Sequence, residues 1–291
     1  MLERNGFLRR DEINIRDPFV LVFDEQYYLY GTRGPVCQGA DTGFDVYVSK
    51  DLENWNGPSE VFRRFSGFWA DSNFWAPEVH YYKESFYMFA SFKAKGVCRG
   101  TQILKADHPD GQFVPLGDRP VTPENWECLD GTLYVQNGTP YLVFCHEWEQ
   151  VGDGEICAVQ LSEDLKQTTG EPVLLFRASE APWVRSIKDK GNFVTDGPFL
   201  YRCENSALLM LWSSFGEGGY TLAAAVSDNG EINGAWRQCE TPIFQKDGGH
   251  GMVFRDLSGK LRLSLHSPNK AYQERPCFYE LTERDNWLFL K

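Results

Sequence analysis

One local pattern recurs five times along the chain and constrains its fold more than any other feature. Each copy opens with a polar residue, continues through a small residue or proline into an apolar run, turns, and returns in a second apolar run. Runs of this kind, rich in aromatic and β-branched residues, are typical of β-strands. The copies recur every 50 to 65 residues or so. The opening residues are Asp17, Glu78, Asp130, Asp196 and His250.

The chain of 291 residues contains no comparably long stretch with a helical period. Each repeat holds its own meander of three or four strands, which predicts an all-β fold arranged radially, a five-bladed β-propeller. A two-domain β-sandwich is the alternative, and a stacked solenoid fits less well because each unit carries several strands. We expect residues 1–291 to form a single domain, with 1–15 or Trp287–Leu290 completing a blade and closing the ring.

Composition narrows the classes of partner. Apolar residues make up 42% of the chain, enough for a packed core, and the net charge is −12 without any cluster of Lys or Arg. This charge argues against a nucleic-acid partner, and no apolar run is long enough to cross a membrane. The eight cysteines form no Cys-x-x-Cys pair and no secretory signal is visible, so we expect reduced thiols and a cytoplasmic location. Nothing in the sequence indicates an oligomeric state.

The five openings converge in a propeller, because the first strand of every blade lines the central channel. Four of the opening residues are carboxylates and the fifth is a histidine. Unpaired carboxylates gathered near an apolar core cost free energy, so their convergence indicates a functional site rather than five separate turn caps. Two chemistries fit such a cluster: binding of a divalent cation through oxygen ligands, and hydrolysis of a glycosidic bond by a carboxylate and a carboxylic acid.

Aromatic residues near the openings favour a sugar ligand. Flat indole rings can stack on sugar faces, and several tryptophans lie in loops or at strand ends close to the openings. We expect Trp75 and Trp148 to contact ligand and the others to pack within the blades. The full set is Trp69, Trp75, Trp126, Trp148 and Trp183.

A set of short motifs follows the same order as the repeats. They are Arg16-Asp17-Pro18, Trp75-Ala76-Pro77-Glu78, Asp130-Gly131, Asp196-Gly197-Pro198, Gly249-His250-Gly251 and the late Arg275. In this order and spacing the chain resembles glycoside hydrolase family 43, the family of β-xylosidases and α-L-arabinofuranosidases, over nearly all of its length. The resemblance implies a five-bladed propeller with three essential carboxylates and an inverting mechanism.

The resemblance also implies roles for individual residues. Asp17 is expected to be the general base that deprotonates water, Asp130 to tune and orient the acid, and Asp196 to be the general acid. His250 matches an axial histidine that binds substrate or contacts a calcium ion in the channel through water, while Arg275 matches an arginine that contacts sugar and the acid. The resemblance implies no required cofactor, and it allows a calcium ion in the central channel.

One departure from the family pattern concerns the acid. The family carries Glu before Gly-Pro, whereas this chain carries Asp196, whose side chain is one methylene shorter. A misplacement of about 1 Å can cost ~100-fold in rate. Three outcomes stay open: the backbone compensates and Asp196 acts as the acid, another acid such as Glu147 or Glu78 replaces it, or catalysis is weak.

The functional prediction is an exo-acting inverting glycosidase that releases a terminal pentose or furanose from plant-type oligosaccharides. It predicts a separation of ~6.5–9.5 Å between the carboxyl groups of Asp17 and Asp196. The sequence does not rank xylose, arabinofuranose and galactofuranose. The alternatives are a non-catalytic carbohydrate-binding propeller with a degraded acid position, and an interaction propeller stabilised by calcium.

Overall fold

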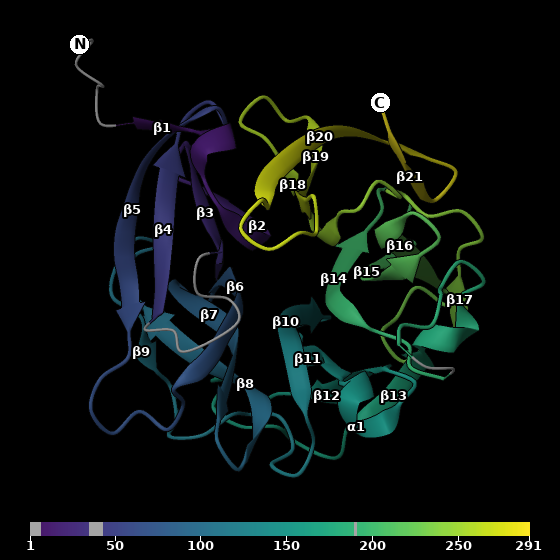
Figure 1. The fold of residues 1–291 in the computed structure, drawn as a ribbon, viewed down its shortest axis with the longest axis horizontal. Coiled ribbons are helices and arrows are strands. Elements are labelled where there is room, and N and C mark those ends of the chain that lie inside the picture. Colours follow the sequence, from purple (N-terminus) through teal and green to yellow (C-terminus); the bar gives the residue numbers. More distant parts are fainter. Residues whose placement is uncertain (1–6, 35–42, 189–190) are drawn as a thin grey trace.

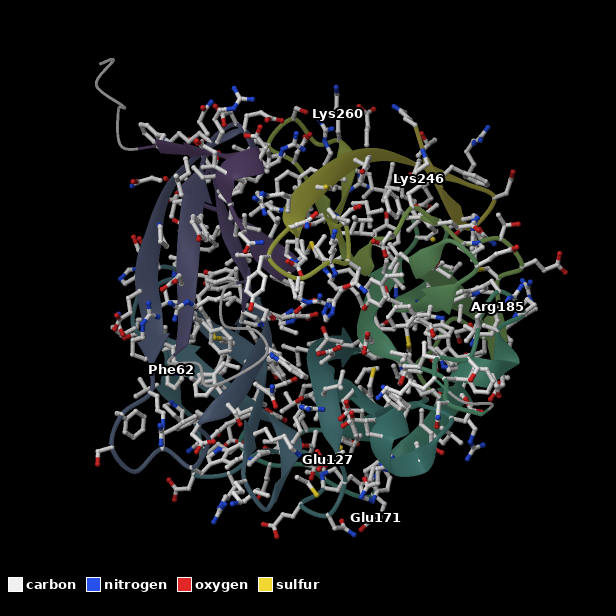
Figure 2. All side chains as sticks on the ribbon, viewed as in Figure 1. Phe62, Glu127, Glu171, Arg185, Lys246 and Lys260 are labelled. Carbon is white, nitrogen blue, oxygen red and sulfur yellow. The ribbon has the colours of Figure 1, made fainter. Side chains whose placement is uncertain are left out.

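The computed structural model describes residues 7–34, 43–188 and 191–291. Five antiparallel sheets stand around a common axis, each built from one continuous part of the chain (Figure 1). The prediction of an all-β, five-bladed propeller is therefore confirmed. Side chains from all five sheets fill the space around the axis, and charged ones such as Glu171 and Lys260 lie at the outer rim (Figure 2).

Strands run outward from the axis in sequence order within each blade. Blade 1 contains β1 (Phe7–Arg9), β2 (Ile15–Phe23), β3 (Gln26–Arg33), β4 (Gly43–Ser49) and β5 (Asn54–Arg63), with β1 added at its outer edge. Blade 2 contains β6 (Ser72–Tyr82), β7 (Ser85–Ala94), β8 (Val97–Ala106) and β9 (Val114–Pro115). Blade 3 contains β10 (Cys128–Gln136), β11 (Thr139–His146), β12 (Glu155–Gln160) and β13 (Val173–Arg177). Blade 4 contains β14 (Asp196–Arg202), β15 (Leu208–Gly216), β16 (Gly219–Ser227) and β17 (Trp236–Gln238). Blade 5 contains β18 (Gly249–Arg255), β19 (Leu261–Ser267), β20 (Arg275–Arg284) and β21 (Trp287–Leu290). Among the described residues, the short helices are the 3-10 turns η1 (Arg10–Glu12) and η3 (Ala178–Glu180) and the single turn α1 (Trp148–Val151).

Tight turns join the first two strands of several blades. The pairs Asp24-Glu25, Lys83-Glu84 and Asn137-Gly138 have positive φ at both residues. This geometry is that of a type I′ turn, whose twist matches a right-handed hairpin. Asn137-Gly138, a residue pair that this turn type favours, forms the hairpin turn between β10 and β11.

A β-bulge interrupts the innermost strand of every blade at the same place. In each blade, one residue of the innermost strand pairs with the second strand, the next two residues have no partner in the register, and the pairing then resumes. The first skipped residue is in the left-handed region of φ in all five blades, with φ of 45° to 55°. The five bulge residues are Asp17, Ala76, Asp130, Gly197 and His250.

The equivalent positions thus differ from the predicted openings in two blades. In blade 2 the bulge residue is Ala76, and Glu78 comes two residues later. In blade 4 it is Gly197, so Asp196 occupies the position before the bulge. The sequence pattern misses this because a bulge changes which residue faces the axis without leaving a distinct composition.

The ring closes through side chains rather than through a shared blade. The strands β1 and β21 each complete their own blade, so the expectation that the termini complete blades holds, but they do not pair with each other. Blade 5 meets the N-terminal segment through Glu274, whose carboxylate pairs with Arg16 at 3.1 Å and whose carbonyl accepts from Asn14 at 2.8 Å. The hydroxyl of Ser264 also donates to the carbonyl of Pro18 at 2.7 Å.

Seven of the eight cysteines lie in the part of the chain that the structure describes, and all seven are free thiols. Five of them are buried, while Cys37 lies outside the described residues. None of the helices within the described ranges has the length and apolarity needed to cross a membrane.

Candidate active site

A ring of hydrogen bonds between blades holds the five bulges around the axis. In four of the five blades, the N–H of the bulge residue donates to a side chain on the second strand of the preceding blade. The pairs are Ala76 to Thr32 Oγ1 (2.7 Å), Asp130 to Ser91 Oγ (2.8 Å), His250 to Ser213 Oγ (2.8 Å) and Asp17 to His266 Nδ1 (3.1 Å). These bonds satisfy buried backbone donors and fix each bulge against its neighbour.

The ring is broken at one place, and this break reaches the carboxylates. The acceptor position in blade 3 is Cys145, which pairs with Leu129 in the register as Ser213 pairs with Asp196. A thiol is a weak acceptor, and burial raises the pKa of Cys145 well above its usual value, so it stays a thiol. The N–H of Gly197 donates instead to Oδ2 of Asp130 at 3.0 Å.

Asp17 is surrounded by groups that favour its charged form. Burial alone would raise its pKa, but the opposing effects of His250, Arg16 and the Thr32 hydrogen bond lower it below the usual aspartate value. His250 Nδ1 lies 3.2 Å from Oδ1, and the hydroxyl of Thr32 donates to Oδ2 at 2.5 Å. Asp17 is therefore an ionised carboxylate near neutral pH, as a general base must be.

His266 is neutral and supports Asp17 from the backbone side. Its Nδ1 accepts the N–H of Asp17, so the ring hydrogen resides on Nε2, which faces Asn269 Oδ1 at 3.3 Å. Burial, followed by the charge of Arg16, lowers the pKa of His266 to about 3. The 3.5 Å approach of Nδ1 to the carboxylate of Asp17 is consequently not an ion pair.

Asp130, from blade 3, lies close to the same histidine, His250. Its Oδ2 is 3.7 Å from His250 Nδ1 and accepts the Gly197 N–H. Burial first, and then the charge of Asp17, raise the pKa of Asp130 well above its usual value. Because neighbouring carboxylates cannot all ionise cheaply, Asp17, Asp130 and Asp196 share fewer than three negative charges near neutral pH.

Asp196 has the properties of a proton donor. It is the residue before the bulge in blade 4, and burial, followed by the charge of Asp130, raises its pKa to about 7. The hydroxyl of Tyr220 donates a hydrogen bond to its Oδ2 at 2.9 Å. The environments of Asp17 and Asp196 thus push their pKa values in opposite directions, which is the signature of a base and an acid working together.

A cavity of about 240 Å³ opens over these groups. The positions before the bulges supply four of its lining residues, namely Arg16, Trp75, Leu129 and Asp196. The bulge residues Asp17, Asp130 and His250 also line it. The remaining lining residues are Thr32, Glu147, Trp148, Ile187, Val194, Phe215 and Tyr220.

The two tryptophans expected to contact ligand both border the cavity, and a cation packs against each of them. The guanidinium of Arg99 lies 4.4 Å from the centre of the Trp75 ring and forms a buried ion pair with Glu147. The ammonium of Lys188 lies 4.6 Å from the ring of Trp148. Two aromatic rings at the cavity are therefore each held by a cation–π contact.

Glu147 is an alternative acid by its pKa alone, which burial, opposed by Arg99, raises to about 7. However, its carboxylate is held in the ion pair with Arg99, whereas the side chain that bonds Asp196 among the described residues is the neutral hydroxyl of Tyr220. Glu78 does not line the cavity; its carboxylate lies 3.1 Å from His80 Nε2. The position and bonding of Asp196 therefore favour it as the acid.

Arg275 requires a correction, since the structure does not place it at the cavity. Its Nε donates to the carbonyl of Asp11 at 2.8 Å, and it joins blade 5 to the N-terminal segment. The arginine that does line the cavity is Arg16, adjacent to the base and paired with Glu274. The place of Arg275 in the sequence does not predict where its side chain points. Arg275 is the first residue of β20, where the chain enters the strand from a loop.

The other three tryptophans do not line the cavity. Trp69 donates to Gln102 and Trp126 stacks on His146 with ring centres 4.2 Å apart. Trp183 packs on Trp212 in a buried core, 4.9 Å between ring centres.

Sequence reasoning missed the residues that hold the carboxylates. Thr32, His266 and Tyr220 come from second and third strands, whose alternating pattern looks like ordinary blade packing. The sequence does carry a signal for Thr32 and His266. Both stand at the end of the second apolar run of their repeats, and the equivalent residues in the other repeats are Ser91, Cys145 and Ser213. Tyr220 carries no such signal.

The fit of a calcium ion can be judged from the donor groups. Within the described residues no group of three or more His, Cys, Asp or Glu side chains is arranged to hold a metal ion. His250 turns Nδ1 toward Asp17 and Asp130, and calcium prefers oxygen ligands. These residues do not form a direct calcium cage.

The fold and this site define a five-bladed propeller whose channel holds an ionised carboxylate, Asp17, and a carboxyl group of raised pKa, Asp196. The chain belongs to glycoside hydrolase family 43: the profile described as "Glycosyl hydrolases family 43" matches residues 12–287. It is therefore a glycosidase, and its substrate is a carbohydrate.

Individual relatives are similar over most of the chain. The solved structure of an endo-arabinase from Bacteroides thetaiotaomicron is 43% identical, with a TM-score of 0.90 over 97% of this chain and 99% of that chain. An extracellular exo-α-(1→5)-L-arabinofuranosidase from Cellvibrio japonicus is 24% identical over 90% of this chain and 76% of its own length. An α-L-arabinofuranosidase from Humicola insolens is 25% identical over 78% of this chain, which spans about half of that protein (47%).

The Cellvibrio relative also corrects the expected location. That protein is described as extracellular, which contradicts the cytoplasmic location inferred from the missing signal and the free thiols. Free buried cysteines do not require a reducing compartment, because burial raises the pKa of thiols such as Cys128 and Cys145 and so keeps them in the unreactive protonated form.

Proposed function

We propose that this protein is an inverting, exo-acting glycosidase that releases terminal α-L-arabinofuranose from arabinose-containing oligosaccharides. The observation that carries the proposal is the opposite protonation of two buried carboxyl groups in one cavity. Asp17 has a pKa below its usual value and Asp196 one raised to about 7. Two of the relatives are arabinofuranosidases and a third is an endo-arabinase, which favours arabinofuranose over xylose or galactofuranose.

The reaction follows from this assignment as a single displacement. Asp17, held by Thr32 and His250, takes a proton from water as the water oxygen attacks the anomeric carbon. Asp196 gives its proton to the glycosidic oxygen as that bond breaks, so the leaving alcohol departs neutral. Because water attacks from the face opposite the leaving group, the configuration inverts. Asp130 influences the proton affinity of Asp196 through its proximity and charge.

The size of the cavity supports exo action. Pockets that enclose drug-sized ligands have volumes of ~300–1,000 Å³, whereas the cavity lined by the described residues has about 240 Å³. This space suits one sugar unit more closely than an internal stretch of polysaccharide. The name of the endo-arabinase relative makes endo action the competing possibility.

The test is a product-resolved screen. Wild type and Asp17→Ala are incubated with xylo-, arabino- and galactofurano-oligosaccharides and with linear arabinan, and products are separated with time. Exo action on arabinofuranose gives free arabinose from the start, with little loss of arabinan viscosity. Early oligosaccharides and a rapid loss of viscosity would show endo action.

A non-catalytic carbohydrate-binding propeller is the second candidate. It would show no turnover of any sugar by wild type, with binding of oligosaccharides retained in calorimetry.

The stereochemistry of the reaction has its own test. Proton NMR of the first product, read before mutarotation, reports the anomer and separates inversion from retention.

A further inference from the structure

Tyr220 donates a hydrogen bond to Asp196 from a neutral side chain. It comes from β16, the third strand of blade 4, and its hydroxyl lies 2.9 Å from Oδ2. The side chain is buried, with 1% exposed, and its ring stacks on His266 at 5.5 Å and 19°. Phe215 packs on it at 5.4 Å, so the phenol is held on two sides.

The phenol is the donor in its hydrogen bond to Asp196. Burial, followed by the charges of Asp196 and Asp17, raises the pKa of Tyr220 well above its usual value, so the hydroxyl keeps its hydrogen. A carboxyl oxygen that accepts a hydrogen bond is the less favoured place for the acid's own proton. With Oδ2 accepting from Tyr220, the proton of the neutral acid resides on Oδ1.

The ring of Tyr220 occupies space that a side chain would fill in another blade. The position before the bulge in blade 5 is Gly249, where the other blades carry Arg16, Trp75, Leu129 and Asp196. A Cβ at Gly249 would lie 2.7 Å from Cε1 of Tyr220 and 2.8 Å from Ser213 Oγ. The missing side chain at 249 therefore leaves room for the phenol to reach the acid.

We propose that Tyr220 is a positioning residue that adapts this propeller to its short acid. It anchors Asp196 through Oδ2, in the space left by Gly249, and so fixes which oxygen delivers the proton. This inference rests on the assignment of Asp196 as the general acid under the proposed function. It accounts for how an aspartate performs a task for which the family pattern has a longer glutamate.

The first test is Tyr220→Phe, measured on aryl arabinofuranosides with good and poor leaving groups. We expect kcat to fall on the order of 10-fold or more for poor leaving groups, with little change for activated ones and little change in KM. The basic limb of the kcat–pH profile should move to higher pH, because the Tyr220 hydrogen bond lowers the pKa of Asp196. Equal losses for both leaving groups and an unmoved basic limb would overturn the proposal.

The double variant Tyr220→Phe with Asp196→Asn separates positioning from general loss of structure. If Tyr220 acts through Asp196, removing its hydroxyl should reduce the rate by less than about 2-fold once the acid is gone. A further loss of about 10-fold when Tyr220→Phe is introduced into the Asp196→Asn background would mean that Tyr220 acts elsewhere.

Tyr30→Phe is the matched control. Tyr30 is also a fully buried tyrosine whose hydroxyl donates one hydrogen bond, to the carbonyl of Pro109, but it does not line the cavity. Its variant should lose stability without a change in the pH profile or the leaving-group dependence. A 3-fluorotyrosine placed at position 220 tests the same bond with the phenol retained: the stronger donor should move the basic limb to lower pH. Failure of wild type to hydrolyse any glycoside would refute the proposed function itself, whereas an active wild type with an unchanged Tyr220→Phe refutes only this inference.

Discussion

The hydroxyl of Thr32 joins Asp17 to the neighbouring blade through two hydrogen bonds of opposite sense. It accepts the N–H of Ala76 at 2.7 Å and donates to Oδ2 of Asp17 at 2.5 Å. Because the backbone N–H can only donate, the hydroxyl hydrogen must point at the carboxylate. The second blade thereby determines the direction of the hydrogen bond that keeps the base charged.

Thr32→Val tests this relationship with little change in volume. The valine leaves the Ala76 N–H without its acceptor and removes a donor that lowers the pKa of Asp17. We expect kcat/KM to fall ~10-fold, since hydrogen bonds to charged groups contribute ~1.5–3 kcal/mol. The acidic limb of the pH profile should move to higher pH. Thr32→Ser, which keeps the hydroxyl, should stay close to wild type in both respects.

The pH dependence of wild-type kcat/KM should be a bell with its upper limb near 7. Below about pH 7 Asp196 holds its proton. The pKa of Asp17 is lowered from the usual 3.8, so Asp17 stays ionised down to a pH below 3.8. The pair therefore leaves a window of high activity between about pH 4 and about pH 7. The limbs are properties of the coupled carboxyl cluster rather than of one residue. An activity that keeps rising above pH 8 would contradict a protonated acid at position 196.

Asp196→Asn should separate substrates by their leaving groups. Leaving groups of high pKa need the proton, so their hydrolysis should fall by ~10²–10⁴-fold. Activated aryl glycosides depart without it and should lose far less. Steady-state rates across a series of substituted phenyl arabinofuranosides give the slope against leaving-group pKa, which should steepen in the variant. Parallel losses along the series would count against Asp196 as the acid.

The same substitution should stabilise the fold at higher pH. The pKa of Asp196 is raised from 3.8 to about 7, so the folded state binds a proton more tightly than the unfolded state between these values. This contribution is fully present below about pH 4 and is lost as pH rises through about 7. Asp196→Asn, which has no charge to bury, should gain stability relative to wild type over this range, by ~4 kcal/mol at most. Denaturant unfolding at pH 4 and pH 8 measures the difference, and an equal effect at both values would contradict it.

Cys145→Ser tests the break in the ring of inter-blade bonds. The serine hydroxyl can accept the Gly197 N–H as Ser91 and Ser213 accept theirs, and Asp130 would lose the bond that lowers its pKa. We expect a several-fold fall in kcat and a shifted pH optimum in a protein that remains folded. Cys239→Ser, at a buried thiol outside the cavity, is the control and should leave the pH profile unchanged.

The sequence predicted the architecture because every blade repeats one local grammar of strand, turn and strand. It also indicated Asp17, Asp130 and His250, since these bulge residues are polar and begin a recognisable apolar run. It did not predict that Glu78 stands two residues past its bulge and Asp196 one residue before. A bulge is a backbone event stabilised by bonds from the next blade, and no local pattern specifies it.

The supporting residues were harder to predict for a related reason. Tyr220 and His266 reach the carboxylates from strands whose side chains otherwise form blade packing, and only the three-dimensional ring brings them together. For Arg275 the sequence predicted a contact that the structure does not show. Its place in the motif order indicated a sugar ligand, whereas its side chain donates to the Asp11 carbonyl at the contact between blades 5 and 1.

The base stands at the seam where the two ends of the chain meet. Asp17 lies on the first blade to be synthesised, yet His250 and His266, which face it, belong to the last, as does Glu274, which pairs with the adjacent Arg16. During translation, a nascent chain that has already formed four blades still lacks the surroundings that keep its base ionised. Chains released early or clipped within the fifth blade would carry all three aspartates without the two histidines that contact Asp17, so we expect hydrolysis to require the fifth blade.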